Sequence, residues 1–275
     1  MRQAPRKSVI ARSELIPGQP RPKRSSIRRS TDRDLAVIRA WLEDEDAREL
    51  PGNFLCNIEV IEECHREGEL LVYCDGATGE AVAFQLGGLI RPGILAVRHE
   101  FRRKGIGRKL AERCIALARK RNQPLLYITC KPSSSVPFWN AMGFVMASTP
   151  GRSSDGAYRV LETELALPSV GRPAAVEVSF YPEAKKWHPD TPPYCTYRPL
   201  ACQADDGVVH LERRLSFHNA SVIECGDVVV EVVVDGERLH LDKAKYDESK
   251  NLGVVRCTNG YYIDQIKVAM SGVNA

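Results

Sequence analysis

The residues whose types and spacing could do chemistry lie in one run, Arg103-Lys-Gly105-Ile-Gly107-Arg108. Glycine lets the backbone approach a ligand closely and accept positive φ angles. The first N–H groups of a helix lack partners inside the helix, and the helix dipole makes that end electropositive. A basic glycine turn that leads into a helix is therefore suited to binding a diphosphate.

The run differs from two common nucleotide-binding motifs. Position 110 is Leu, so the third glycine of Gly-x-Gly-x-x-Gly is missing, and the Gly-Lys-Ser/Thr of a phosphate-binding loop is also missing. A bare Gly-x-Gly is also compatible with an ordinary helix start that carries a solvated basic face. The surrounding sequence has to decide between these alternatives.

Two elements must position this turn. The apolar stretch 94–97 predicts a short strand before it, and the residues from about 108 toward 121 predict a helix after it. The apolar face of that helix carries Leu110, Cys114, Leu117 and Ala118.

Three segments together resemble the GNAT superfamily of acyl-CoA-dependent N-acyltransferases. The run Arg102-Arg-Lys-Gly105-Ile-Gly107 is similar to that family's Arg/Gln-x-x-Gly-x-Gly/Ala signature, and Leu95-Ala-Val97 precedes it at the family's offset. Phe138-Trp-Asn-Ala-Met-Gly-Phe144 resembles the aromatic-x-x-x-Gly-Phe segment that closes the same domain. The resemblance covers Ser25 to Leu165, a little over half of the chain.

The resemblance implies an α/β fold, a mixed, splayed sheet with helices on both faces, and an acyl-CoA held where two neighbouring parallel strands splay apart. The strand before the turn would pair with the pantetheine amides, the turn would hold the diphosphate, and the N–H of Val97 would face the thioester oxygen. The coenzyme-binding residues implied in this way are Leu95, Ala96, Val97, Arg102, Arg103, Lys104, Gly105, Ile106, Gly107 and Arg108.

The catalytic side chains that the family often uses are missing, so the catalytic residues are left unassigned. Thr129 or Cys130 stands where the family often has a Glu base, and Trp139 stands where it often has a Tyr acid. An indole N–H donates hydrogen bonds but is no useful acid. The Asn that touches CoA in the family is replaced within Ser133-Ser-Ser135.

Three outcomes follow. The base can come from elsewhere, with Glu100, His99, Glu80 and Asp75 as candidates, although each is more typical of a solvated loop. Catalysis can rely on placing an amine against the thioester, which supplies much of the rate enhancement by itself. Alternatively, the domain binds acyl-CoA without turnover. The first two are favoured together.

Composition and charge bound the remaining possibilities. The 275 residues favour two domains, and the net charge is +4. The first 30 residues hold nine Arg or Lys and one acid, Glu14, and residues 1–24 have few large apolar groups, which predicts a disordered basic tail. No apolar run reaches the ~20 residues of a membrane-spanning helix. Nine cysteines without close pairs are typical of a reducing compartment, so we expect a cytoplasmic protein.

The hydrophobic pattern predicts the order of elements in residues 25–167. A strand at 25–29, a helix capped at Thr31 or Asp32 that extends to about 47, and a second helix near 57–67 come first. The later elements are strands at 70–74, 81–87 and 125–130, a short helix holding Phe138 and Trp139, and a hairpin of 144–148 and 158–165 around Pro150-Gly151.

Residues 168–175 contain two prolines and a glycine and are expected to be a linker. Beyond it, β-branched clusters predict a small all-β sandwich or barrel over residues 176–275, with no recognised family. The expected strands are 176–180, 208–217, 228–234, 238–241, 254–257 and 261–268, with hairpin turns at Asp235-Gly236 and Asn259-Gly260 and a helix within 242–250.

Histidines and cysteines of the β region do not have metal-site spacing, so no metal is expected. The set is His188, Cys195, Cys202, His210, His218, Cys225 and Cys257. The aromatic segments 187–194 and 261–262 are candidate contacts for a ligand or a protein partner, although aromatic side chains also cover sheet edges.

The sequence thus predicts a transferase that moves an acetyl group from acetyl-CoA to a primary amine by direct attack, with the β domain selecting the acceptor or a protein partner. The alternative is a catalytically weak acyl-CoA sensor or scaffold. Neither a membrane nor a nucleic acid is expected as a partner. The sequence does not name the acceptor.

Overall fold

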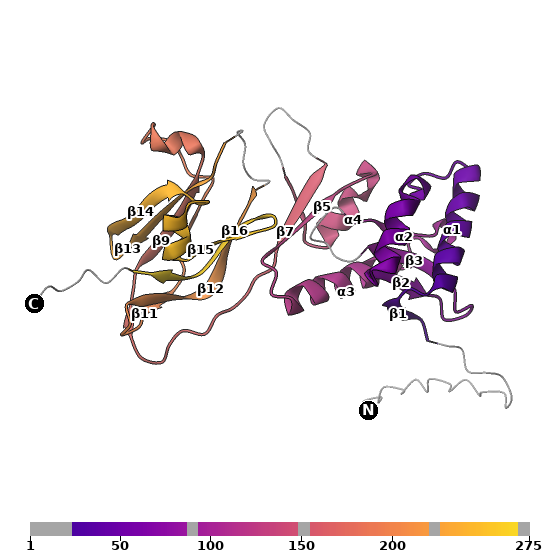
Figure 1. The fold of residues 1–275 in the computed structure, drawn as a ribbon, viewed down its shortest axis with the longest axis horizontal. Coiled ribbons are helices and arrows are strands. Elements are labelled where there is room, and N and C mark those ends of the chain that lie inside the picture. The colour runs from indigo at the N-terminus through magenta and orange to yellow at the C-terminus, as the bar shows by residue number, and fades with distance from the viewer. Residues whose placement is uncertain (1–23, 87–92, 148–154, 220–225, 269–275) are drawn as a thin grey trace, which may run out of the picture.

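A computed structural model describes residues 24–86, 93–147, 155–219 and 226–268. The expected tail therefore lies outside the described residues, apart from its last position, and so do the hairpin turn at Pro150-Gly151 and Cys225. The chain forms two parts side by side, with the amino-terminal helices and sheets at the right of Figure 1 and the carboxy-terminal strands at the left. None of the helices in the described ranges is long and apolar enough to cross a membrane.

The amino-terminal part begins with an antiparallel sheet in the order β1-β2-β3-β4. Its strands are β1 (Ser26–Arg29), β2 (Leu70–Cys74), β3 (Ala81–Leu86) and β4 (Leu95–Val97). Helices α1 (Asp32–Ala47) and α2 (Ile58–Arg66), with the one-turn helix η1 (Leu55–Asn57) between them, pack on one face through Ile38, Leu42 and Ile61. Helix α3 (Ile106–Lys120) covers the opposite face with Ile106 and Leu110.

A second, separate sheet follows in the order β5-β7-β6. Its strands are β5 (Leu125–Thr129), β6 (Val145–Met146) and β7 (Gly156–Val160). Helix α4 (Val136–Ala141) and the rear of α3 pack against it in a core that includes Cys114, Ile128 and Trp139. Short helical turns η2 (His99–Phe101) and η3 (Ser133–Ser135) complete this part. The expected helices on both faces and the split of the sheet between β4 and β5 are confirmed, whereas every pairing within the described residues is antiparallel.

The carboxy-terminal part is a β-sandwich and not a closed barrel. One sheet has the order β10-β9-β13-β14 and the other β15-β16-β12-β11-β8. Valine-rich faces of the two sheets meet in one core that includes Val178, Val232, Leu211 and Ile263. The strands are β8 (Arg172–Pro173), β9 (Val176–Tyr181), β10 (Cys195–Tyr197), β11 (Ala201–Gln203), β12 (Val208–His218), β13 (Val229–Val234), β14 (Glu237–Lys243), β15 (Val254–Cys257) and β16 (Gly260–Lys267).

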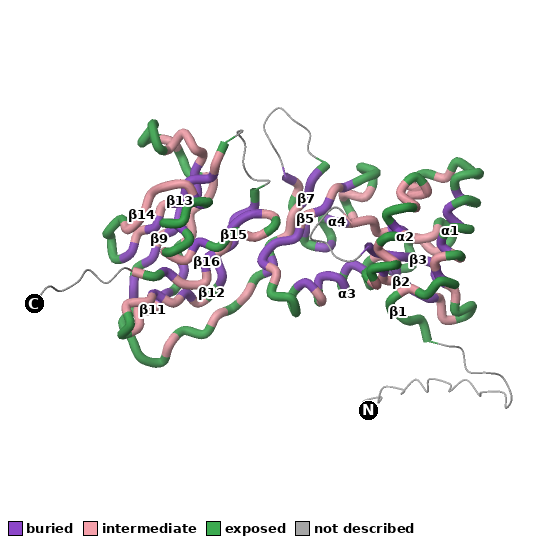
Figure 2. Tube along the Cα trace, in the orientation of Figure 1, coloured by how far each residue is buried: buried purple, intermediate pink, exposed green. Residues whose placement is uncertain are grey.

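Buried and partly buried residues alternate along most of β13 and along the first part of β12, as expected for strands with one face in a core (Figure 2). The turn η4 (Glu183–Lys186) and helix α5 (Asp247–Leu252) decorate this part. The expected helix within 242–250 therefore begins later, because residues up to Lys243 extend β14. The expected linker contributes β8, which pairs with β11.

Backbone hydrogen bonds join the two parts. After β7 the chain runs along β12, where Arg214 N donates to Thr163 O at 2.9 Å and Leu165 N donates to Glu212 O at 2.7 Å. The outer face of β5 and β7 also meets the end of β12, since the His218 ring stacks on Tyr158 and Tyr127 with centroids 4.3 and 5.6 Å apart. The sandwich thus packs against the second sheet of the amino-terminal part.

Candidate functional site

The site begins with the edge of β4. Leu86 N donates to Ile94 O at 3.0 Å and Arg98 N donates to Val82 O at 2.9 Å, so the peptide groups of even-numbered residues face β3. In an antiparallel strand the N–H and C=O of one residue point to the same side, and those of the next residue point to the other side. The backbone groups of Leu95 and Val97 therefore point away from β3. Because β4 is the last strand of its sheet, this edge can accept an added strand.

The turn after β4 has two residues in the left-handed region. Arg103 has φ 62° and Gly105 has φ 76°, and Gly105 is the N-cap of α3. A side chain is strained at Gly105 by the backbone angle alone, since a Cβ there would meet nothing within 4 Å. The expected helix start near Arg108 is wrong by two residues. Because α3 starts at Ile106, Gly107 lies in its first turn.

Free amides collect at this helix start. The first bond of the α3 ladder runs from Lys109 N to Gly105 O at 3.2 Å, so the N–H groups of residues 106–108 precede the ladder. The side chains of Arg103, Lys104 and Arg108 are exposed around them. Lys104 Nζ lies 4.7 Å from the Phe101 ring centroid. The turn thus offers amides, a helix N-terminus and three solvated cations at one place, a combination suited to a diphosphate.

Gly107 brings the helix start close to the neighbouring strand. A Cβ built there would lie 3.6 Å from Leu95 Cδ2 and 3.6 Å from the Phe138 ring. Both distances are ordinary contacts, so a methyl group fits and a larger side chain does not. The β4 edge, the start of α3 and the aromatic segment around Phe138 therefore meet at Gly107.

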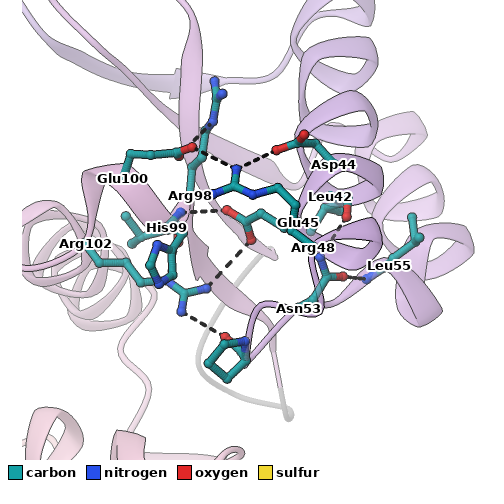
Figure 3. Close-up of polar contacts among 12 residues, drawn as sticks. Leu42, Asp44, Glu45, Arg48, Asn53, Leu55, Arg98, His99, Glu100 and Arg102 are labelled. Atoms are coloured by element: carbon teal, nitrogen blue, oxygen red, sulfur yellow. Dashed lines mark hydrogen bonds and ion pairs between the residues drawn. The ribbon is translucent and has the colours of Figure 1, made fainter.

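Arg102 behaves differently from the other basic residues of the signature. Its Nε donates to Val97 O at 2.9 Å and its Nη1 donates to Pro51 O at 2.9 Å. Its Nη2 lies 3.8 Å from Glu45 Oε2. Figure 3 shows the guanidinium directed toward α1 and the segment after it. The side chain is thus engaged with protein groups.

Glu45 is a residue of this site that sequence reasoning missed. Its side chain is 1% exposed, and its Oε1 accepts the N–H of His99 at 2.6 Å. Its Oε2 has no hydrogen-bond partner among the described residues. The available signal is its position seven residues after Ile38 and three after Leu42, on the buried face of α1.

The expected base candidates are arranged at one end of the β1–β4 sheet. Glu100 is exposed, lies 3.2 Å from Arg98 and 3.4 Å from Arg48, and its pKa is lowered by a hydrogen bond from its own backbone N–H and by these arginines. Asp75 accepts the N–H groups of Ala77 and Thr78 in the β2–β3 turn. Local contacts therefore favour the ionised form of Glu100.

The remaining candidates give no clear acid or base. The side chain of His99 is exposed, and only its backbone N–H contacts Glu45. Glu80 is half-buried in the β2–β3 turn, and its carbonyl accepts Asp75 N at 2.9 Å.

The residues at the positions of the family's acid and base are poor proton carriers. Trp139 is buried in the core between α4 and β5. Burial, with a smaller effect of Asp155, raises the pKa of Cys130, whose Sγ lies 3.9 Å from Met146 Sδ. Thr129 is half-buried at the end of β5, and its hydroxyl does not ionise near neutral pH.

The described residues of the β-rich part bring no group of metal ligands together. Within the described ranges, no three His, Cys, Asp or Glu side chains are placed to hold a metal ion. Of the aromatic candidates, Trp187 is 64% exposed and Tyr261 is buried, while the Tyr262 ring lies 4.3 Å from the Arg214 guanidinium. Trp187 is therefore the aromatic residue of this group that is free to meet a partner.

Comparison with known proteins identifies the first of the two parts. Residues 36–144 match the model of the acetyltransferase (GNAT) family. This part of the chain is a GNAT domain. It contains the β4 edge, the glycine turn and the aromatic segment described above. No curated protein matches the chain.

The chain is also similar, over about half of its length, to solved structures that include the following three. Ard1 from Thermoplasma volcanium is 21% identical, with a TM-score of 0.38 over 50% of this chain and 97% of its own. The GNAT family N-acetyltransferase YhbS from Escherichia coli, in complex with CoA, is 16% identical, with a TM-score of 0.39 over 52% and 84%. The ribosomal-protein-S18-alanine N-acetyltransferase from Escherichia coli is 17% identical, with a TM-score of 0.39 over 54% and 99%.

Proposed function

We propose that residues 25–167 form an N-acyltransferase that moves an acetyl group from acetyl-CoA to a primary amine. The observation that carries this proposal is the unpaired edge of β4 followed directly by the left-handed turn at Gly105 and the start of α3. An edge strand suits an extended amide chain, and a helix N-terminus suits a diphosphate. Coenzyme A carries both groups, an amide-containing pantetheine arm and a diphosphate.

In this proposal each segment holds one part of the donor. The N–H groups from Arg103 to Arg108 bind the diphosphate, and the exposed cations of the turn add charge. The outward backbone groups of Leu95, together with the Val97 N–H, pair with the pantetheine arm. The Val97 N–H then lies beside the thioester oxygen, which becomes negative when the amine attacks.

The transfer is a direct displacement at the thioester carbonyl. The amine nitrogen forms a bond to the carbonyl carbon, the C–S bond breaks, and the thiolate takes up a proton while the amine gives one to water. We assign no side chain to either proton. Placing the two reactants in contact within the site can supply much of the rate enhancement by itself.

A second function, binding of acyl-CoA without turnover, is favoured by one observation. The positions of the family's acid and base hold Trp139 and either Thr129 or the buried Cys130, whose pKa burial raises. A sensor or scaffold of this kind would keep the same binding residues.

Release of the CoA thiol tests both functions. Purified full-length chain is mixed with acetyl-CoA and a panel of amines that contains peptide amino termini, lysine peptides and small polyamines. We expect thiol release that depends on one class of amine. Calorimetric binding of CoA without thiol release from any amine favours the sensor, and the absence of binding heat contradicts both functions.

The β-rich part supplies acceptor or partner selection in this proposal. Its boundaries are taken as 176–275, with 168–175 as the connection and 1–24 as the tail. The support is the exposed Trp187 and the proximity of the sandwich to β5 and β7. We also infer a cytoplasmic location from the nine cysteines without close spacing. Deletion of residues 176–275 is expected to change amine preference more than CoA affinity.

A further inference from the structure

The side chain of Arg102 connects three segments that are far apart in the sequence. Its two hydrogen bonds reach the carbonyl of Val97, at the end of β4, and the carbonyl of Pro51, after α1. Its third contact is the ion pair with Glu45, near the end of α1. Because a guanidinium is planar and rigid, these contacts fix the relative positions of the segments.

Glu45 supports this arrangement from inside the protein. It is almost completely buried and holds the N–H of His99, the second residue after Val97. Removing a carboxylate from water is costly, and a nearby arginine offsets part of that cost. Glu45 and Arg102 therefore hold the chain on both sides of Arg98, just where β4 ends (Figure 3).

The Val97 carbonyl is informative because it shares the open edge of β4 with the Val97 N–H. Both groups of an edge residue point to the same side. Since Arg102 Nε occupies the carbonyl at 2.9 Å, only the N–H of this residue is available to a substrate. A rotation of these peptide planes would move that N–H away from the thioester oxygen.

We propose that Arg102 and Glu45 are positioning residues that aim the Val97 N–H at the thioester, and that Arg102 is not a ligand of the diphosphate. This inference rests on the proposed acyl transfer. It assigns Arg102 a role different from that of Arg103, Lys104 and Arg108, whose side chains are exposed at the helix start. Misplacement of a reacting group by 1 Å can cost about 100-fold in rate.

Two donors distinguish a positioning residue from a phosphate ligand. Acetyl-CoA contains the diphosphate, whereas S-acetylpantetheine lacks the nucleotide and its phosphates but keeps the thioester and the amides. We expect Arg102→Gln and Glu45→Gln to lower kcat by about 10-fold or more with both donors. We expect the Kd for CoA, measured by calorimetry, to change by less than about 3-fold.

Arg103→Ala and Lys104→Ala are the matched controls, since they remove neighbouring cations with exposed side chains. We expect them to reduce kcat/KM with acetyl-CoA and to leave S-acetylpantetheine unaffected. The double variant Arg102→Gln/Glu45→Gln is expected to lose no more activity than the stronger single variant, because the two residues act as one unit. Thermal unfolding checks that each variant is folded. If Arg102→Gln does not fold, Glu45→Gln is used to test the same contact.

Two results would overturn the inference. A loss for Arg102→Gln that is confined to acetyl-CoA, with a CoA affinity lowered by about 10-fold or more, makes Arg102 a diphosphate ligand. Unchanged kcat with both donors removes the positioning role. If the wild-type chain turns over neither donor, the proposed function has failed separately. The Arg98 N–H belongs to the same peptide group as the Val97 carbonyl, so its NMR shift reports on the contact with Arg102. A changed Arg98 shift in Arg102→Gln with unchanged CoA affinity then supports the positioning contact, and a lowered CoA affinity contradicts it.

Discussion

Gly105 shows how one residue can determine the shape of a binding site. Its φ of 76° is strained for every other residue type, and its missing side chain faces no protein atom within 4 Å. The requirement is therefore conformational and not one of packing. A Cβ at this position would also occupy space from which a diphosphate would approach the helix start.

The variant Gly105→Val tests this requirement. We expect a loss of CoA affinity of about 10-fold or more and a loss of unfolding free energy of about 1–2 kcal/mol, because a β-branched residue resists the left-handed region. Calorimetry and chemical denaturation measure the two effects.

Gly79→Val is a matched control, since Gly79 has φ 74° in the β2–β3 turn and also no neighbour within 4 Å. An equal loss of CoA affinity in both variants would contradict a role of Gly105 in the site.

The sequence predicts contiguous site residues and misses Glu45. The glycines and the strand before them lie within fifteen positions and form a local pattern that can be recognised without a structure. Glu45 acts on His99, 54 residues away, and such a contact exists only after α1 has packed on the sheet. Its place beside the apolar residues Ile38, Trp41 and Leu42 on the buried face of α1 is the one signal that points to it.

Helix α1 carries Glu45, and its start is fixed by a reciprocal cap. Thr31 Oγ1 accepts the Asp34 N–H, while Asp34 Oδ2 accepts the Thr31 N–H at 2.8 Å. Asp34 also forms two hydrogen bonds with the Arg28 guanidinium of β1. Hydrogen bonds from Arg28 and Thr31 lower the pKa of Asp34, against the effect of burial.

Removing the capping hydroxyl is expected to weaken this element. We predict that Thr31→Ala lowers the free energy of unfolding by about 1 kcal/mol, because one N–H at the helix start loses its partner. Urea denaturation measures the change. Thr31→Ser keeps the hydroxyl and is expected to lose less than half as much, and a similar loss in both variants would argue against the cap.

The stability of the protein is expected to depend on pH through His218, at the end of β12, where this strand meets β5 and β7. His218 is 3% exposed, and burial lowers its pKa to about 4 from 6.5. The unfolded chain therefore binds the proton first as the pH falls. The contribution of His218 to stability is complete above pH 6.5 and is lost between pH 6.5 and 4, by up to about 3 kcal/mol.

We predict that His218→Phe flattens this part of the stability curve while keeping a ring between Tyr127 and Tyr158. Denaturation at a series of pH values from 7 to 4 measures the difference between wild type and variant. His188→Phe makes the same replacement at an exposed histidine and serves as the control. Parallel curves for wild type and His218→Phe would show that His218 titrates normally.

Elements with strong periodicity are predictable and short edge strands are not. The sequence predicts α1, β9 and β13 because their apolar residues recur at helical or strand spacing. Strands β10 and β11 have three residues each and no alternation, and they form because β9 and β12 offer them partners. The same long-range pairing explains β8 in the expected linker.

The buried side chain of Arg214 connects the two parts of the molecule. Its side chain is 2% exposed and forms two hydrogen bonds with Asp264 at 2.7 and 2.6 Å. Its Nη1 also donates to Asn122, beyond the end of α3, at 3.1 Å. The sequence gives no sign that Arg214 contacts Asn122, because the two residues are 92 positions apart and belong to different parts of the molecule.

We predict that Arg214→Ala lowers the free energy of unfolding by about 3 kcal/mol, since it leaves the Asp264 carboxylate and the Asn122 carbonyl without their donor. Scanning calorimetry is expected to show one transition for wild type and two for the variant. Arg198→Ala removes an exposed pair with Glu177 and is expected to cost less than about 1 kcal/mol. A similar cost for both variants would contradict the linking role.

The segment between the two parts is anchored at both ends. Leu165 is bonded to β12, while Arg172 and Ala175 are bonded to the Asp235 carboxylate in the β13–β14 turn. Between these points Val170 is 67% exposed. Limited proteolysis at Val170 is therefore expected to yield two fragments that still elute together in size-exclusion chromatography. The folded protein would then keep its structure without an intact chain at this point.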